Sequence, residues 1–480
     1  MQSIWEKGFD MPGRGALRGD IEADALVVGA GIAGVNCAYR MRRAGLKVVV
    51  LEAERVGTGA TSRTTGKITA QHGLIYDLLT RSFDARTAKL YARANQNAVE
   101  EYAEIVSREK IDCDFERADN FVFAREDTAL LEAEFEALRA AGLDARLEGK
   151  TELPFPVKGA VGVSGQAHFH PLKYLRALAE KLEIYEHSRV ESIEDNVART
   201  EMGSVRARDI VVATHFPFIN APGYYFLRMH QERSAVMALE GAPEIRGMYI
   251  DEADGGLSFR PQGGALLVGS GSWRTGKNPG NQFAELRRKA KECYPDAREI
   301  AAWSSQDCMP QDHIPYIGRY AGSTKHLWVA TGFGKWGMSS SMVAAMLLTD
   351  LITGASNEAA DVFSPQRSPV RGIDGFAADV KETVKGFAKY IMPPKNMLED
   401  IRPGEAGTVE YEGRKLGAYR DERGEIHLVS LSCPHLGCIL GWNPDDLSWD
   451  CPCHGSRFDI DGALLDGPAQ RNLAEKEDES

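Results

Sequence analysis

The sequence Asp24-Ala-Leu-Val-Val-Gly29-Ala-Gly31-Ile-Ala-Gly34 joins an apolar, strand-type run to three glycines spaced Gly-x-Gly-x-x-Gly. A helix-type stretch follows from Val35 to Arg43, and a second strand-type run, 47–51, ends at Glu52. Gly29 allows a tight turn, Gly31 lets the backbone approach a pyrophosphate, and Gly34 lets helix and strand pack closely. Strand, helix, second strand and acidic end together predict a dinucleotide-binding βαβ unit; an ordinary structural turn is the alternative. The predicted contact residues are Gly29, Gly31, Ile32, Ala33, Gly34, Glu52 and Ala53.

The next segment, 55–67, is rich in Gly, Ser and Thr. It resembles the segment that wraps the FAD diphosphate and ribityl chain in the D-amino-acid-oxidase-like flavoproteins, a group that includes glycine and sarcosine oxidases. The resemblance implies FAD rather than NAD, and an ordinary surface loop is the alternative. The contacts it implies are Thr61, Ser62, Arg63, Thr65, Gly66 and Lys67.

Three later segments resemble the same group. A predicted strand at 188–193 is similar to the one whose Val backbone meets the adenine, and the buried strand 209–213 ends in the Ala-Thr pair usual beside FAD. The Pro-x-x-Gly turn at 315–318 and the Gly-rich turn at 331–338 are similar to the two turns that meet the isoalloxazine. The helix predicted after the second turn would point its N-terminus at the flavin pyrimidine and stabilise negative charge on the reduced ring. The residues implied are Val190, Ala213, Thr214, Gly318, Gly332, Gly334, Lys335, Trp336, Gly337 and Met338.

The Gly-rich turn also has a second interpretation. Gly332, Gly334 and Gly337 fit Gly-x-Gly-x-x-Gly, which is the pattern of a second nucleotide site. No following strand carries an acid for a ribose, because Asp350 falls inside the predicted helix. We therefore prefer the flavin turn.

Residues 225–270 contain short strand-type runs separated by Gly, Pro and Asp, a pattern that predicts an antiparallel sheet. In the resembling family such a sheet covers the flavin and supplies the substrate pocket. No side chain stands out as a general base, so the catalytic residues are not identified from the sequence. Arg260, His170 and Trp336 are pocket candidates, and Tyr249, Phe259 and Trp273 are candidate wall residues; each is equally compatible with a structural role.

A second decisive stretch lies near the C-terminus: Cys433-Pro-His435-Leu-Gly-Cys438, twelve residues, then Cys451-Pro-Cys453-His454-Gly-Ser456. Each arm offers one Cys and one His. Thiolates suit soft metals and imidazoles suit iron or zinc, so two Cys and two His make a metal site on chemistry alone. A Cys2His2 zinc site and a structural Cys-rich loop are the alternatives at this point.

The stretch resembles the Rieske pattern C-x-H-x(15–17)-C-x-x-H, in which two Cys hold one iron of a [2Fe–2S] cluster and two His hold the other. The resemblance implies Cys433, His435, Cys451 and His454 as ligands and a disulfide between Cys438 and Cys453. Ser456 stands where high-potential Rieske proteins donate a hydrogen bond to the cluster. Phe458 replaces their second donor, a Tyr, so we expect a potential below that of the respiratory forms.

Composition limits the function classes. The 480 residues carry a net charge of −12, which argues against nucleic acid and anionic membranes as partners. No apolar run approaches the about 20 residues that span a bilayer, and residues 1–20 lack the apolar core of a signal peptide. We expect a cytoplasmic protein. The remaining cysteines are expected to be free thiols: Cys37, Cys113, Cys293 and Cys308.

The predicted architecture has three parts. Residues 1–370 form an FAD-dependent oxidoreductase, with an α/β, Rossmann-like FAD-binding domain of the glutathione-reductase type and an antiparallel-sheet substrate domain. The FAD-binding segments lie at about 22–75, 183–220 and 300–355, and the substrate-binding segments at about 76–182 and 221–299. Residues 371–396 form a helical linker, and residues 397–480 a small all-β Rieske [2Fe–2S] domain.

Flavin accepts two electrons and a [2Fe–2S] cluster accepts one at a time, so their fusion suggests an electron splitter. We expect oxidation of an amine or amino acid, with electrons passing from FAD to the cluster and on to an external one-electron acceptor protein. Two alternatives remain open. In one, a ferredoxin-like donor reduces the cluster and the flavin reduces a substrate; in the other, the chain is a redox sensor or partner-binding protein without turnover.

Overall fold

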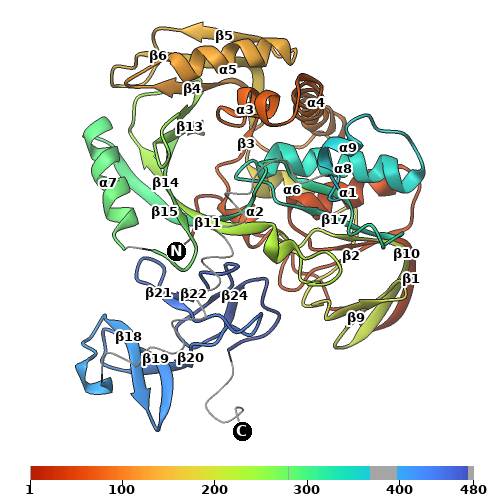
Figure 1. Cartoon of the computed structure of the whole chain (residues 1–480), viewed down its shortest axis with the longest axis vertical. Coiled ribbons are helices and arrows are strands. Elements are labelled where there is room, and N and C mark those ends of the chain that lie inside the picture. The colour runs from red at the N-terminus through yellow and green to blue at the C-terminus, as the bar shows by residue number, and fades with distance from the viewer. Residues whose placement is uncertain (1, 279, 368–396, 474–480) are drawn as a thin grey trace.

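The computed structural model describes residues 2–278, 280–367 and 397–473 (Figure 1). Two large sheets and their helices form the N-terminal part, and two small sheets form the C-terminal part. This arrangement confirms the predicted fold class of an α/β domain, a largely antiparallel domain and a small all-β domain.

The first large sheet has the order β16-β17-β10-β1-β2-β7, with β9 and β8 extending from β10. β1, β2, β7, β10 and β17 run parallel, and β16 is antiparallel to β17. The residues 25–28 of β1 and all of β2 are buried, as expected for strands covered on both faces. The strands are β1 (Gly19–Val28), β2 (Val48–Leu51), β7 (Glu183–Tyr185), β8 (Ser192–Glu194), β9 (Val197–Thr200), β10 (Gly203–Val212), β16 (Tyr316–Arg319) and β17 (Leu327–Thr331).

The second large sheet has the order β15-β11-β14-β13-β12-β4-β6-β3, with β5 paired to β6. Its pairs are antiparallel except β4 with β12. The strands are β3 (Lys67–Ile68), β4 (Glu116–Ala124), β5 (Ala145–Glu148), β6 (Gly159–His168), β11 (Met229–Glu240), β12 (Met248–Asp251), β13 (Ser258–Gln262), β14 (Ala265–Arg274) and β15 (Arg298–Pro310).

The helices complete the N-terminal part. α1 and α8 pack against each other beside the first sheet, and α8 is buried along most of its length because its residues are apolar or small on all sides. The helices are α1 (Ile32–Arg43), α2 (Ala60–Arg63), α3 (Ile75–Ser82), α4 (Ala85–Glu109), α5 (Ala129–Ala140), α6 (Pro171–Ala179), α7 (Gln282–Cys293), α8 (Gly337–Thr353) and α9 (Ala360–Phe363), with a 3-10 turn η1 (Tyr225–Leu227).

The C-terminal part holds a three-stranded sheet, β18-β19-β20, and a four-stranded sheet, β21-β22-β23-β24. Trp449 and Phe458 are buried in its core, and Trp442 packs against that core. The elements are η2 (Leu398–Asp400), β18 (Ala406–Tyr411), β19 (Arg414–Arg420), β20 (Ile426–Ser430), β21 (Gly441–Asn443), β22 (Ser448–Asp450), β23 (Arg457–Phe458) and β24 (Leu464–Asp466).

Several predicted boundaries need correction. β1 begins five residues early because residues 19–23 pair with β10 despite their polarity. Val190 lies between β7 and β8 rather than inside a strand, and Gly318 lies in strand β16 rather than in a turn. β15 includes residues 300–310, which the sequence assigned to the FAD-binding segments, yet it pairs with β11 in the second sheet. The predicted helical linker, residues 371–396, lies outside the described residues.

Candidate flavin and iron-sulfur sites

The predicted dinucleotide turn lies where β1 ends and α1 begins. A Cβ on Gly34 would come within 1.8 Å of the Gly29 carbonyl oxygen, so no side chain fits between helix and strand. Glu52, at the carboxyl end of β2, accepts hydrogen bonds from the backbone N–H groups of Ala30 (2.7 Å) and Glu54 (2.9 Å). Burial raises the pKa of Glu52. The turn therefore presents backbone N–H groups and a held carboxylate at one sheet edge, as a dinucleotide requires.

The segment after β2 folds back over this turn. The Thr61 hydroxyl on α2 accepts a hydrogen bond from the Ile32 N–H (3.0 Å), and a Cβ on Gly31 would lie 3.2 Å from it. Ala213 lies on the other side, because a Cβ on Gly29 would come within 2.6 Å of its carbonyl oxygen. Ser62 is buried, Arg63 and Thr65 are half-buried, and the Thr214 hydroxyl donates to the Phe216 carbonyl. The structure thus brings the first two predicted FAD segments together with the end of β10.

Lys67 is buried on β3, in the second sheet. Its ammonium donates to the Tyr249 carbonyl (3.1 Å) and to the Ser258 hydroxyl (2.8 Å). Burial, and then the charge of Arg260, lower the pKa of Lys67 to about 7. This residue therefore links the wrapping segment to the predicted substrate sheet.

The Gly-rich turn between β17 and α8 lies against strands β11 and β15. The Gly334 N–H donates to the Cys308 carbonyl (3.0 Å), and the Lys335 ammonium lies 3.2 Å from a Glu232 oxygen and 2.7 Å from the Ser272 hydroxyl. The Trp336 ring stacks on His72 with ring centroids 4.8 Å apart. α8 begins at Gly337, so its N-terminus opens toward this turn.

The remaining predicted flavin contacts are more scattered. Val190 is buried beside the first sheet, and Met338 is buried in the first turn of α8. A Cβ on Gly318 would come within 2.8 Å of Pro365, so this glycine packs against the chain near 365.

The three pocket candidates do not form one cluster. His170 accepts from the Lys173 N–H as the N-cap of α6 and packs against Trp5 at 5.0 Å, which is a structural role. Arg260 lies over the same Trp5 ring at 5.2 Å and donates to His168 and the Phe169 carbonyl. Trp336 stacks elsewhere, on His72. The candidate wall residues Tyr249, Phe259 and Trp273 lie in a hydrophobic core cluster.

The residues before β1 are fixed to the rest of the chain by Trp5. Trp5 is 1% exposed, and its indole N–H donates to the Thr64 carbonyl (2.6 Å). Trp5 therefore anchors these residues to the segment that wraps the candidate FAD site.

The predicted cluster ligands converge in the C-terminal part. The thiols of Cys433 and Cys451 are both buried, and their interaction lowers the pKa of Cys433 and raises that of Cys451. The imidazoles of His435 and His454 lie with centroids 4.9 Å apart at an interplanar angle of 90°. Two thiols and two imidazoles therefore meet at one place, as a Rieske centre requires.

The imidazole of His435 has the form that binds a metal. Burial lowers its pKa to about 4, so the ring is neutral. Its Nε2 hydrogen bonds to Oδ1 of Asn220 at 2.9 Å, which places the ring proton on Nε2. Its Nδ1 is buried without a hydrogen-bond partner among the described residues. The free Nδ1 lone pair fits a ligand to the second iron.

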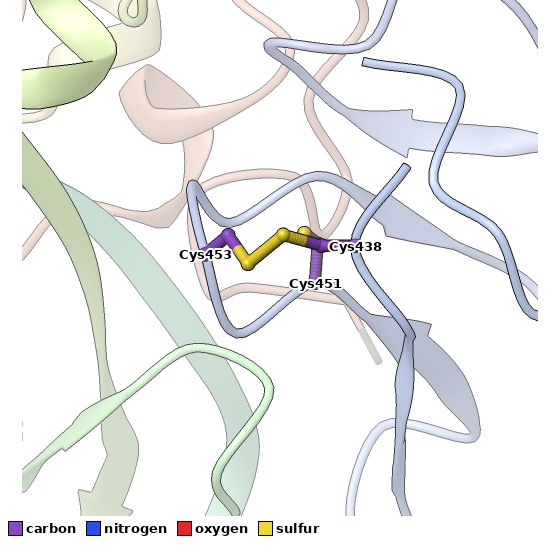
Figure 2. A group of neighbouring side chains, drawn as sticks. All are labelled: Cys438, Cys451 and Cys453. Carbon is purple, nitrogen blue, oxygen red and sulfur yellow. A yellow bond between two sulfur atoms is a disulfide. The ribbon is translucent and has the colours of Figure 1, made fainter. Parts of the chain in front are cut away.

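The disulfide implied by the Rieske resemblance is present between Cys438 and Cys453 (Figure 2). The Cys451 sulfur lies close to both bridged sulfurs, and the three can be grouped by distance alone. Bridged sulfurs cannot act as thiolate ligands, so this trio is no metal site by itself. The cysteines outside the stretch, Cys37, Cys113, Cys293 and Cys308, are free thiols as predicted.

The cluster loops contact the N-terminal part of the chain, called the flavin part below, through residues that no motif indicates. Gln231 on β11 donates to the His454 carbonyl (2.7 Å), and Gln306 on β15 donates to the Gly455 carbonyl (2.9 Å). Phe226 packs edge-on against both histidine rings. The sequence could not identify these residues, because strands and a loop far from the Cys–His stretch supply them.

A buried ion pair joins the same two parts. Arg233 on β11 contacts Asp446 at 2.6 Å, with side chains 1% and 10% exposed. Burial opposes the charge on Asp446, but the guanidiniums of Arg233 and Arg457 outweigh it and hold the pKa of Asp446 below its usual range. Such a pair is costly to break, because either partner alone would remain a buried charge.

Comparison with known proteins agrees with both sites. The model of the family described as FAD dependent oxidoreductase matches residues 24–351, and that of the Rieske [2Fe-2S] domain matches residues 394–477. A Bacillus subtilis protein named as a Rieske 2Fe-2S iron-sulfur protein, YhfW, is 37% identical over 98% of this chain and 97% of its own length. Gamma-glutamylputrescine oxidoreductase of Escherichia coli is 30% identical over 41% of this chain and 50% of its length.

The crystal structure of glycine oxidase from Geobacillus kaustophilus superimposes with a TM-score of 0.59 at 20% identity, over 72% of this chain and 99% of that one, and so shares the fold. No helix in the described parts of the chain is long and apolar enough to cross a membrane. The Gly29–Gly34 cradle fits FAD, and the paired thiols and neutral His435 fit a [2Fe–2S] cluster. The chain therefore belongs to the FAD dependent oxidoreductase family and carries a C-terminal Rieske [2Fe-2S] domain.

Proposed function

We propose that this chain oxidises an amine or amino acid at the carbon next to nitrogen and passes the electrons, one at a time, through the Rieske cluster to an external one-electron acceptor protein. Bound FAD supplies the two-electron step by accepting a hydride from that carbon. The observation that carries the proposal is the contact of both predicted redox sites with one strand: Cys308 of β15 accepts from the flavin turn, and Gln306 of β15 donates to the cluster loop.

The amine class is supported by the similarity to gamma-glutamylputrescine oxidoreductase, which covers part of the chain. The described residues contribute orientation and charge rather than an evident general base. The N-terminus of α8 favours negative charge at the flavin turn, where the reduced ring would carry it, whereas the Lys335 ammonium there is paired with Glu232. When a neutral amine loses a hydride from the carbon next to nitrogen, the main requirement on the site is to align that carbon with the flavin.

The electron path argues for a dehydrogenase. A flavin that delivered its electrons directly to O2 would leave a cluster held at the adjoining strands without a role. Instead, hydrogen bonds from strand β15 reach both the flavin turn and the loop that carries the predicted cluster ligand His454. Transfer in single steps requires a partner that accepts one electron at a time, which is the ordinary partner of a [2Fe–2S] protein.

The test is to mix the anaerobic holoprotein with a panel of amines and amino acids while following flavin absorbance and the cluster EPR signal together. The proposal expects one class of compound to bleach the flavin and the EPR signal of the reduced cluster to appear afterwards. If no compound bleaches the flavin, but a reduced ferredoxin produces the EPR signal and then reduces the flavin, the electron flow is the reverse. If neither treatment changes either signal and binding of a partner depends on redox state, the sensor alternative applies.

A further inference from the structure

Strand β15 lies at the edge of its sheet and touches both candidate redox sites within three residues. The Cys308 carbonyl accepts from Gly334 of the flavin turn (3.0 Å). Two residues earlier, the Gln306 amide donates to the Gly455 carbonyl of the cluster loop (2.9 Å). A path of two hydrogen bonds and a short backbone segment therefore runs from the flavin turn to the residue next to His454.

The neighbouring strand β11 reinforces this path. Gln231 pairs with Cys308 in register, so its side chain leaves the sheet on the same face as that of Gln306. Its amide donates to the carbonyls of His454 (2.7 Å) and Gly467 (3.0 Å), and its Oε1 accepts from Gln306 (2.7 Å). The two glutamines are 1% and 6% exposed, so they form one buried, connected amide pair.

The cluster loop is shaped to meet this pair. Gly455 has φ of +87°, and a Cβ there would come within 2.6 Å of the Gln231 Cβ. A side chain at position 455 would therefore push the loop away from β11. From the other side, Asn220 and Phe226 contact the imidazole of His435. The flavin part thus contacts the cluster site at two separate places, the His454–Gly455 backbone and the imidazole of His435.

The glutamine contacts join strands β11 and β15 to the backbone of the loop that carries His454. In Figure 1 the small sheets of the C-terminal part lie beside the β11–β15 end of the second large sheet. The buried pair Arg233–Asp446 fixes the same face two residues further along β11. Arg233 also donates to the Gln306 Oε1 (3.1 Å), so the docking pair and the two glutamines belong to one hydrogen-bond network.

We propose that Gln231 and Gln306 are positioning residues for electron transfer inside the chain: they fix the His454–Gly455 backbone and complete the hydrogen-bonded route from the flavin turn to the cluster. The inference rests on the proposed function, since it assumes that electrons cross between these sites. In each crossing one electron leaves the reduced flavin and enters the oxidised cluster, no covalent bond to the glutamines forms or breaks, and the flavin proton goes to solvent. An external one-electron acceptor then reoxidises the cluster before the second crossing.

The test is laser-flash reduction of the anaerobic holoprotein by photogenerated deazariboflavin radical, which delivers one electron to the flavin without any substrate. The cluster absorbance then reports arrival of that electron. For Gln231→Leu combined with Gln306→Leu we expect the first-order rate to fall at least tenfold, while iron and FAD content and both midpoint potentials stay as in the wild type. Gln166→Leu is the matched control, because Gln166 is buried in the same sheet and hydrogen bonds to Ala70, Gln96 and Ser164, all within the flavin part.

An unchanged transfer rate in the fully loaded double variant would overturn the route. If the Leu variants do not load the cluster, Gln231→Asn and Gln306→Asn keep an amide but withdraw it by one methylene, and the same slowing is expected. Because the flash needs no amine, failure to find a substrate would count against the proposed reaction and leave this measurement intact. A wild-type protein that shows no flavin-to-cluster transfer at all would contradict both.

Discussion

At the scale of single residues, two polar side chains act on opposite sides of the candidate cluster site. The Ser456 hydroxyl accepts from the Ala469 N–H (3.0 Å), which leaves its own proton to donate toward the Cys433 thiol, whose pKa this hydroxyl lowers. Asn220 accepts from the imidazole of His435. A donor to sulfur stabilises the reduced cluster, whereas an acceptor on the imidazole makes that ligand more basic and stabilises the oxidised cluster.

Ser456→Ala should therefore lower the cluster potential. A hydrogen bond worth about 1 to 2 kcal/mol corresponds to roughly 40 to 80 mV for one electron. An EPR-monitored redox titration measures the shift directly. Phe458→Tyr, which adds a second donor, should move the potential upward, and the wild-type value should lie within about −150 to +300 mV, below that of the respiratory forms. A potential unchanged in Ser456→Ala would mean that this hydroxyl does not reach the cluster.

Asn220→Ala should shift the potential in the opposite direction, because His435 loses the acceptor that increases its basicity. The same titration applies, and the EPR line shape checks that both histidines still bind. The two variants control for each other, since general loosening of the site would move both potentials the same way. A downward shift in Asn220→Ala would contradict the proposed role of Asn220.

At the scale of elements, helices α3 and α5 are joined by a buried carboxyl. Glu134 on α5 accepts from the Tyr76 and Asp77 N–H groups at the start of α3, both at 2.9 Å. Burial raises the pKa of Glu134 from 4.5 to about 7. Because the pKa of Glu134 is higher in the folded than in the unfolded chain, protonated Glu134 contributes to the free energy of unfolding. This contribution, at most about 3 kcal/mol, is fully present below pH 4.5 and is lost as the pH rises through 7.

Glu134→Gln removes this titration. The unfolding temperature of the wild type should fall more between pH 4.5 and 7.5 than that of the variant, whatever the absolute stability of each. Glu136→Gln, exposed on the same helix, controls for loss of a negative charge. Equal pH dependence in wild type and Glu134→Gln would show that this carboxyl ionises normally.

The elements also show what the sequence could and could not predict. The βαβ unit follows from local spacing, and the Cys438–Cys453 disulfide is implied by the Rieske resemblance of the Cys–His stretch; both are found as predicted. The sequence places residues 300–310 among the FAD-binding segments, whereas β15 pairs with β11 in the second sheet, because this pairing depends on a partner about 70 residues away along the chain. The sequence offers Arg260, His170 and Trp336 as pocket candidates, but Trp5 packs against the first two through long-range contacts that the sequence does not show.

The interface residues Asn220, Gln231 and Gln306 could not be predicted for a related reason. A glutamine on a strand carries no motif, and its role arises only when a second domain brings backbone carbonyls within reach. The spacing of residues along the sequence predicts local sites. Docking between domains depends instead on surfaces assembled from distant segments of the chain.

At the scale of the whole molecule, Arg233 and Asp446 hold the two parts together. Arg233→Leu should release the C-terminal part, because it leaves Asp446 buried with one cationic partner fewer, at a cost of about 3 kcal/mol. Small-angle scattering should show a larger radius of gyration, and the flavin-to-cluster transfer rate should fall with it. Arg287→Leu, which removes an exposed pair with Glu299 on the same half of the molecule, should leave both unchanged.

The central claim is that electrons pass between flavin and cluster within one chain. The most direct test is the rate of cluster reduction after flavin reduction, measured anaerobically by flash photolysis over a hundredfold range of protein concentration. The account predicts a first-order rate that does not change with concentration. A rate that rises in proportion to concentration would contradict it, because the electron would then pass between separate molecules.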